Sequence, residues 1–170
     1  MADRELGRFR DAFARLRSDK SASRWPAETH HRAPHKPLLL LTIMDLVAQE
    51  HLRDAFVPLD DRLLEEFERY WVSVLPGRRT SDLALPYFHL KSDGFWSLVP
   101  RPGMEQVVAA VDQIRSLGPL RASVLGARLD PNLFHLLVQR DTRNALRQVL
   151  IETYFAPDLW PTLLDVAQIA

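Results

Sequence analysis

The residues best suited to chemistry lie in one short segment, residues 30–37, where three histidines, an arginine, a lysine and two prolines stand close together. Four leucines, Leu38–Leu41, follow directly. The leucines must be buried, whereas the charged segment must stay near water. The junction therefore predicts a rigid, cationic and partly apolar edge where a helix enters the core. Such an edge suits an anion, and a nucleic-acid backbone is the commonest large one.

The histidines of this segment also raise the question of a metal site. His31 and His35 are four residues apart, as two ligands on one helix would be. However, Pro34 disfavours helical backbone at Ala33, no glutamate lies between the two histidines, and the chain has no cysteine. We therefore predict neither a metal nor another cofactor. A metal-dependent nuclease built on His30, His31 and His35 remains an alternative.

Other catalytic patterns are missing from the sequence. It has no Gly-x-Ser-x-Gly motif and no glycine-rich phosphate loop. Asp82, Asp93 and Glu105 have no spacing that singles them out as a nuclease cluster. We expect a domain that binds and does not catalyse.

A second basic segment follows residue 76. It carries two arginines and two hydroxyl side chains: Arg78, Arg79, Thr80 and Ser81. These groups are typical of phosphate contacts, although they also suit an exposed loop that its charge keeps soluble. Residues 1–36 hold nine Lys and Arg against five Asp and Glu, and residues 76–101 hold four against two. If folding brings these stretches together, a chain of zero net charge still has a positive face.

Residues 85–90 form a mostly apolar run that we interpret as a β-strand. Pro86 would confine this strand to the edge of a sheet. Alternation puts Pro86 and Tyr87 on opposite faces, so either one face is an exposed ligand surface or both are buried. The Asp-Gly pair in residues 91–94 predicts a tight turn to a second strand at residues 95–99.

Hydrophobic spacing, caps and breakers predict the remaining elements. Helices are expected at residues 3–18, 37–50, 104–117, 131–138 and 161–169, from Asp60 or Asp61 to Val74, and from Asp141 or Thr142 to Phe155. Residues 55–58 read as extended, residues 122–129 are ambiguous but compatible with a strand, and Gly118-Pro119 is expected to end a helix. The predicted fold is mostly α with a small β-hairpin or sheet, an α+β class, in a single domain over residues 1–170.

Composition sets the broad class of the protein. The chain has 170 residues, of which 46% are hydrophobic and 26% charged. The lack of cysteine excludes disulfides and favours the cytosol. The charged opening, Met-Ala-Asp-Arg-Glu, is not a signal peptide, and no apolar run approaches the length of a membrane span. We expect a soluble, cytoplasmic domain without membrane contact.

Three segments are similar to those of a known family. His31-Arg32-Ala33-Pro34-His35-Lys36-Pro37-Leu38-Leu39-Leu40 and Leu85-Pro86-Tyr87-Phe88-His89-Leu90-Lys91-Ser92-Asp93-Gly94-Phe95-Trp96 resemble the paired signatures of the sulfur-binding domain, a module of McrA-like type IV HNH restriction endonucleases. Leu129-Asp130-Pro131-Asn132-Leu133-Phe134, with Leu146 through Tyr154-Phe155, resembles the helical tail of that group. The matches span most of residues 28–156.

The resemblance implies binding of double-stranded DNA that carries a phosphorothioate, in which sulfur replaces a non-bridging phosphate oxygen. It implies an apolar sulfur pocket made by His31, Arg32, Leu85, Pro86 and His89. We further expect contacts to the DNA backbone and bases, because basic and hydroxyl side chains bind phosphate oxygens and arginine can read guanine. The candidates are Lys36, Arg78, Arg79, Thr80, Ser81, Tyr87, Lys91 and Arg101. Leu85 stands where the family has an aromatic residue, and His89 where it has a small one.

Members of this family carry an HNH nuclease in the same polypeptide. This sequence has no His-Asn-His metal cluster. The resemblance therefore implies a non-catalytic recognition domain that serves modification-dependent restriction. Its nuclease is expected elsewhere in the parent polypeptide or in a separate chain.

The solvation of sulfur and oxygen agrees with this interpretation. A phosphate oxygen pressed against proline and aliphatic carbon loses its water without replacement, at a cost of about 1–3 kcal/mol. Sulfur is softer and less hydrated, so it loses less and gains dispersion contacts. A DNA-binding module without sulfur preference and a protein-interaction domain with an exposed apolar strand remain alternatives.

Overall fold

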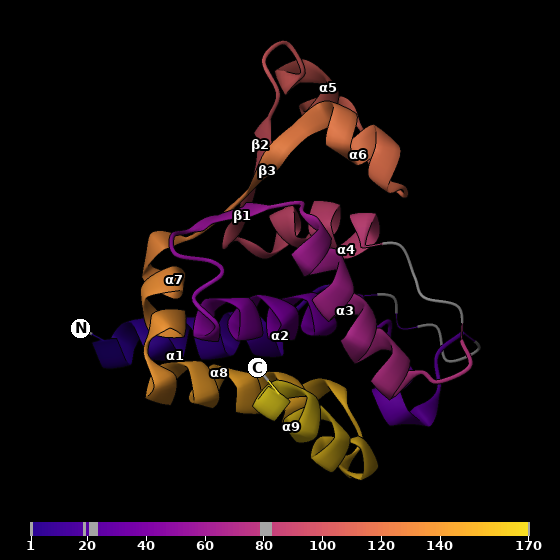
Figure 1. Ribbon diagram of the computed structural model, residues 1–170, viewed down its shortest axis with the longest axis vertical. Coiled ribbons are helices and arrows are strands. Elements are labelled where there is room, and N and C mark those ends of the chain that lie inside the picture. Colours follow the sequence, from indigo (N-terminus) through magenta and orange to yellow (C-terminus); the bar gives the residue numbers. More distant parts are fainter. Residues whose placement is uncertain (1, 19, 21–23, 79–82, 170) are drawn as a thin grey trace.

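The apolar run of the sequence forms a central buried helix. In the computed structural model, which describes residues 2–18, 20, 24–78 and 83–169, helix α2 extends over His35–Ala48. Every residue from Lys36 to Val47 is buried. Pro37 lies in the first turn, as predicted, where its missing N–H costs no hydrogen bond. The helix lies in the middle of the molecule (Figure 1).

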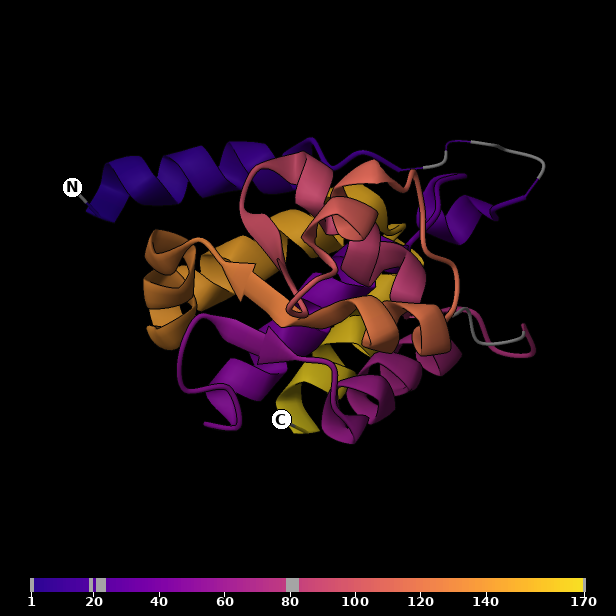
Figure 2. The ribbon, with the colours of Figure 1, turned by 90° about the horizontal axis from the view of Figure 1, so that it is seen from above.

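Other helices surround α2. They are α1 (Ala2–Ala14), α3 (Asp61–Val74), α7 (Pro131–Val138), α8 (Arg140–Tyr154) and α9 (Trp160–Ile169), with short 3-10 helices η1 (Ala27–Thr29) and η3 (Pro157–Leu159). Seen from above, α1 runs along one side of α2 and α3 along the other (Figure 2). Asp60 caps α3 by accepting a hydrogen bond from the Leu63 N–H at 2.9 Å, and Asp130 caps α7 through Asn132 N–H. Asp60 is one of the two residues, with Asp61, at which the sequence predicts the start of α3.

The sheet is small and antiparallel. Its strands are β1 (Phe56–Pro58), β2 (Trp96–Pro100) and β3 (Val124–Leu129), in the order β1-β3-β2. The chain between β2 and β3 contains helices α5 (Glu105–Ala110) and α6 (Leu117–Ser123). With β2 and β3 it forms an arm, residues 96–129, that projects from the helical body (Figure 1). The prediction of a mostly α fold with a small sheet is confirmed.

Phe56 explains why the middle strand contains a glycine. Its ring lies against Gly126, so that a Cβ atom at this position would lie 2.3 Å from the Phe56 ring. The Arg128 guanidinium also lies over this ring, 5.7 Å from its centroid. The aromatic ring thus replaces the side chain that β3 lacks and connects β1 to the middle of the sheet.

The structure corrects the predicted strand at residues 85–90, which is helix α4 (Ala84–His89). Pro86 lies in the first turn of this helix, where proline is tolerated. The Asp-Gly pair does not form a hairpin turn, because residues 90–93 continue as the 3-10 helix η2 (Leu90–Asp93) and Gly94, with φ of 91°, ends it. Strand β2 pairs instead with the distant β3.

Other boundaries also differ from the predictions, and the helix predicted over residues 3–18 ends at Ala14. The helix expected over residues 104–117 is only α5, Glu105–Ala110. Gly118 and Pro119 do not end a helix but lie in the first turn of α6. Proline there lacks an N–H that the helix would leave unpaired in any case. None of the helices in the described part of the chain is long and apolar enough to span a membrane.

Candidate functional site

A cavity of about 630 Å³ lies beside α4, next to the start of α2. Its described lining is Arg17, Ser18, Arg24, Trp25, Ala33, His35, Lys36, Leu85, Pro86, His89, Gln113 and Arg115. We call it the α4 cavity. Four of these side chains are basic at neutral pH and four are apolar, and none of the described lining residues carries a carboxylate. The cavity therefore combines positive charge with apolar surface.

Helix α4 accounts for the apolar wall of the cavity. Positions i and i+4 of a helix lie on one face, so Leu85, Pro86 and His89 can point to the same side. All three line the cavity, Leu85 and His89 as half-buried residues and Pro86 as a buried one. In the predicted strand, Leu85 and Pro86 would have faced opposite sides. The correction to a helix thus brings together three residues that the family resemblance assigned to one pocket.

Tyr87 lies on the inner side of α4, which corrects the expectation that it contacts DNA. Its side chain is fully buried, and its hydroxyl donates to the Val57 carbonyl oxygen at 2.5 Å. Burial raises the pKa of this hydroxyl. The Tyr87 carbonyl accepts a hydrogen bond from Trp96 Nε1 at 2.7 Å. Tyr87 therefore fixes α4 to the sheet and leaves the opposite side of the helix to the cavity.

A buried ion pair holds Lys36 at the cavity wall. Its Nζ lies 2.5 Å from Asp93 Oδ2, and the two side chains are only 7% and 3% exposed. Asp93 Oδ1 also accepts a hydrogen bond from the backbone N–H of Arg17 at 3.0 Å. One carboxylate thus joins the end of α1, the start of α2 and η2. It also neutralises much of the lysine charge at the wall.

The other charged groups of the cavity are less confined. Arg17, Arg24 and Arg115 are exposed at its rim. His89 is half-buried, and its pKa is lowered by burial and by the positive charges of Lys36, Lys91 and Arg115. The charged form of His89 is therefore disfavoured, and the lysine and arginine side chains supply positive charge to the cavity.

His31 and Arg32 do not line the α4 cavity. His31 has left-handed backbone with φ of 56°, and its Nδ1 lies 2.9 Å from the Trp25 carbonyl oxygen. It lines a second hollow, of about 690 Å³, together with Arg78. Trp25 lines both spaces. Arg32 stacks on the Tyr154 ring, with 5.1 Å between the guanidinium carbon and the ring centroid.

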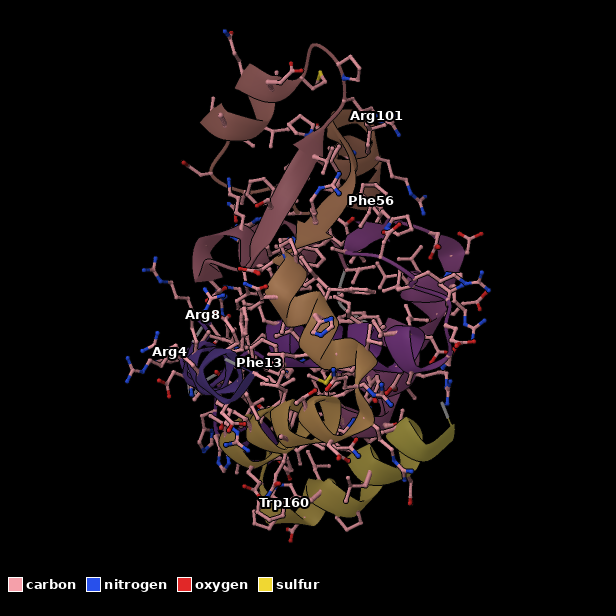
Figure 3. The ribbon with its side chains drawn as sticks, turned by 90° about the vertical axis from the view of Figure 1, so that its left-hand side faces the viewer. Arg4, Arg8, Phe13, Phe56, Arg101 and Trp160 are labelled. Carbon is pink, nitrogen blue, oxygen red and sulfur yellow. The ribbon has the colours of Figure 1, made fainter. Side chains whose placement is uncertain are left out.

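The remaining predicted DNA contacts are distributed around the cavity. Arg78 lies over the Trp25 ring at 4.3 Å, and Lys91 lies over the Phe88 ring at 4.1 Å. Arg101 lies on the arm (Figure 3), where its Nε donates to the Arg121 carbonyl at 2.6 Å. Three other predicted contacts, Arg79, Thr80 and Ser81, fall outside the described residues.

Several lining residues were not identified from the sequence. In the sequence, Arg17 belongs to the polar face of a predicted amphipathic helix, and Arg24 lies in a predicted loop. Arg115 is more than 70 residues away from both. His35 packs against Trp25 and Trp71, with ring centroids 5.2 and 5.1 Å apart. These groups meet at the cavity only because the fold places Arg17, Arg24 and Arg115 beside α4, and no local pattern in the sequence predicts that arrangement.

The described residues include no group of three or more His, Asp or Glu side chains that could hold a metal ion. In the nuclease alternative, His35 would be a ligand, but its ring lies within the aromatic contacts to Trp25 and Trp71. Comparison of the chain with protein-family models and with curated proteins finds no match.

Proposed function

We propose that this protein is a non-catalytic domain that recognises phosphorothioate-modified double-stranded DNA, with the α4 cavity as the receptor for the sulfur atom. The observation that carries the proposal is the composition of one wall. Leu85 and Pro86 line the same space as Arg17, Arg24 and Arg115, and no carboxylate comes from the described lining residues. The sequence resemblance supports the same function.

The apolar wall is the basis of discrimination. An unmodified phosphate that faces Leu85 and Pro86 would turn a well-hydrated oxygen towards carbon, which costs about 1–3 kcal/mol. Sulfur is larger and less hydrated, so it loses less water and gains dispersion contacts. The pairing of Lys36 with Asp93 adds to this preference, because the ammonium is already compensated and attracts an entering oxygen less.

The rim supplies affinity. Arg17, Arg24 and Arg115 stand around the opening, where they suit the phosphates on either side of the modified linkage. Arg78 and Lys91 extend this surface, and Arg101 lies further along the arm. Contacts of this kind release counterions, so binding should weaken steeply as salt increases. These phosphate contacts act equally on the modified and the unmodified duplex. Discrimination between the two duplexes comes from the apolar wall.

The proposed role is recognition in modification-dependent restriction. The domain would direct a nuclease, in the parent polypeptide or in a separate chain, to sulfur-containing DNA in the cytoplasm. Cleavage itself is assigned to that nuclease. The described residues supply a binding cavity. Of the histidines in the nuclease alternative, His35 is engaged in ring contacts and His31 in a contact to a backbone carbonyl oxygen.

The test is a fluorescence-anisotropy titration with two duplexes of one sequence at matched salt. One duplex carries a single phosphorothioate of defined stereochemistry, and both stereoisomers and several flanking sequences are measured. We expect one stereoisomer to bind about tenfold more tightly than the unmodified duplex, as a 1–3 kcal/mol penalty implies. Equal binding of all duplexes would leave a DNA-binding module without sulfur preference. Failure to bind any of them would favour a protein partner.

A further inference from the structure

Another concave site lies at the other end of the molecule, between α8 and α9. This groove, which we call the α8–α9 groove, has a volume of about 780 Å³. Its described lining is Ala48, Arg140, Arg143, Asn144, Arg147, Gln148, Ile151, Glu152, Trp160, Leu164 and Ala167. Figure 1 shows both helices at the end of the molecule opposite the arm. The groove shares no lining residue with the α4 cavity.

Three arginines form a row along one side of the groove. Arg140, Arg143 and Arg147 follow each other at spacings of three and four residues, which places them on one face of α8. At 1.5 Å per residue, their Cα atoms span about 10 Å along the helix axis. Successive phosphate groups of an oligophosphate fit such a row, because planar guanidinium groups bind phosphate oxygens in pairs.

Two of these arginines are held in place by the protein. Arg143 Nη1 donates to the carbonyl oxygens of Leu137 and Val138, at 2.9 and 3.2 Å, at the end of α7. Arg147 Nη2 lies 3.1 Å from the buried carboxylate of Asp45. Arg140 is exposed at the start of the row. The guanidinium groups of Arg143 and Arg147 are thus fixed before a ligand arrives, which reduces the entropy lost on binding.

The positive charge of the row exceeds what the neighbouring carboxylates compensate. Asp45 lies below Arg147, and Glu152 accepts a hydrogen bond from Gln148 at 2.9 Å. No described lining residue offers a carboxylate to Arg140 or Arg143. The pKa of Arg143 is lowered by burial and by the charges of Arg147 and Arg140. The Nε atoms of Arg143 and Arg147 are buried and have no hydrogen-bond partner among the described residues.

The rest of the groove is apolar and partly aromatic. The Trp160 indole is oriented by a hydrogen bond from its Nε1 to the Phe155 carbonyl oxygen, 2.9 Å long. Figure 3 shows Trp160 at the surface, at the end of the molecule away from Arg101. Leu164 is 46% exposed. An indole and an exposed leucine suit a planar, weakly polar ring, and they have no role in binding a bare phosphate chain.

We propose that the α8–α9 groove binds a nucleoside di- or triphosphate, with the phosphate groups on Arg140 and Arg143 and the base beside Trp160. The site is separate from the α4 cavity, and the proposal does not depend on recognition of DNA there. Nucleotide binding would give the domain a second ligand. Its stabilising effect would act on α8, which also packs against the central helix α2.

Isothermal titration calorimetry on the whole chain at constant ionic strength tests the proposal. The probes are ATP, GTP, tripolyphosphate and adenosine. We expect ATP or GTP to bind with 1:1 stoichiometry and more tightly than tripolyphosphate, and adenosine to bind at least tenfold more weakly, because it lacks the charged groups. Lack of saturable binding of both ATP and GTP would overturn the proposal.

Two variants locate the site. Arg140→Gln should weaken binding of the nucleotide about fivefold, the effect of one partly exposed charged contact. Arg10→Gln is the matched control, since Arg10 is an exposed arginine of α1 that lines neither cavity, and it should leave binding unchanged. Equal weakening by the two variants would mean unspecific attraction and would overturn the assignment. So would an unmodified oligonucleotide that competes for the groove while the free nucleotides do not bind.

Discussion

The α4 cavity and the α8–α9 groove both collect positive charge, but they arrange it differently around apolar surface. In the groove, three arginines of one helix form a row, and the apolar residues lie beyond it. In the cavity, cations from four separate segments surround an apolar wall made by Leu85 and Pro86. A row of cations suits ordinary phosphate groups. A ring of cations around carbon favours a phosphate ester with one poorly hydrated atom.

The largest effect on the α4 cavity is expected from removal of the Asp93 carboxylate, which joins three segments at its wall. Asp93→Asn leaves the buried Lys36 ammonium without a counter-charge and should lower the free energy of unfolding by about 3 kcal/mol. Urea unfolding measures this change. Replacing both residues, as Lys36→Met with Asp93→Asn, should restore more than half of the loss, because no unpaired charge remains.

Glu5→Gln is the matched control for Asp93→Asn. It removes one partner of the exposed Glu5–Arg8 pair and should cost less than about 1 kcal/mol. A cost below about 1 kcal/mol for Asp93→Asn as well would contradict the view that this ion pair assembles the cavity.

On the groove side, the buried Asp45 should make stability depend on pH. Burial raises the pKa of Asp45 from 3.8 to about 6 in the folded protein, so the folded state binds a proton more tightly than the unfolded chain does. Its contribution to stability is therefore greatest below pH 4 and is lost as the pH rises to about 6. The loss amounts to about 3 kcal/mol.

Asp45→Asn isolates this contribution. The variant keeps an oxygen that can accept from Tyr70 or Arg147 but no longer titrates. Relative to the native chain, the variant should gain about 2 kcal/mol in unfolding free energy between pH 4 and pH 6.5, as measured by chemical denaturation. A difference between the two proteins that stays constant over this range would contradict the assignment.

The next largest effect concerns the apolar wall of the cavity. Pro86→Ser adds a hydroxyl that can hydrogen-bond to a phosphate oxygen, which removes the 1–3 kcal/mol penalty on the unmodified duplex. The expected tenfold preference for the phosphorothioate duplex should fall to less than about twofold in anisotropy titrations. Pro161→Ser, in the first turn of α9, is the matched control and should preserve the preference. If Pro86→Ser weakened binding of both duplexes equally, Pro86 would not be the residue that contacts the sulfur.

The smallest effect concerns the rim. Arg115→Gln should weaken both duplexes by a similar factor of about three to five, because a phosphate contact carries no information about sulfur. The slope of log K against log salt should fall by about 0.9, the value for one phosphate. Arg10→Gln provides the control for a lost surface charge. A selective loss of binding to the phosphorothioate duplex would assign Arg115 to the wall.

Local patterns in the sequence were sufficient for the central helix but not for the sheet. Leu38–Leu41, with Pro37 before them, predict α2, and the start of α3 at Asp60 or Asp61 is confirmed with Asp60 as its cap. The partner of β2 could not be predicted, because β3 begins more than 20 residues later and non-local pairing leaves no trace in periodicity. The Asp93-Gly94 pair instead predicts a local hairpin, which the structure does not contain.

Some residues assigned to the sulfur pocket line the α4 cavity and others do not, and the difference has a physical cause. Leu85, Pro86 and His89 do line one cavity, although as a helix face and not as a strand. His31 and Arg32 precede α2 in the sequence, but left-handed backbone at His30 and His31 turns the chain there. The His31 side chain contacts Trp25, and the Arg32 side chain contacts Tyr154. The rim arginines come from segments whose meeting depends on the whole fold.

A crystal structure of the protein with a duplex that carries one phosphorothioate of the tighter-binding stereochemistry tests the central claim most directly, because the anomalous signal of sulfur locates the atom without assumptions. We predict that the sulfur lies within about 4 Å of carbon atoms of Leu85 and Pro86, with Arg17, Arg24 or Arg115 on the adjacent phosphates. Sulfur facing solvent, or a duplex bound away from α4, would contradict the account.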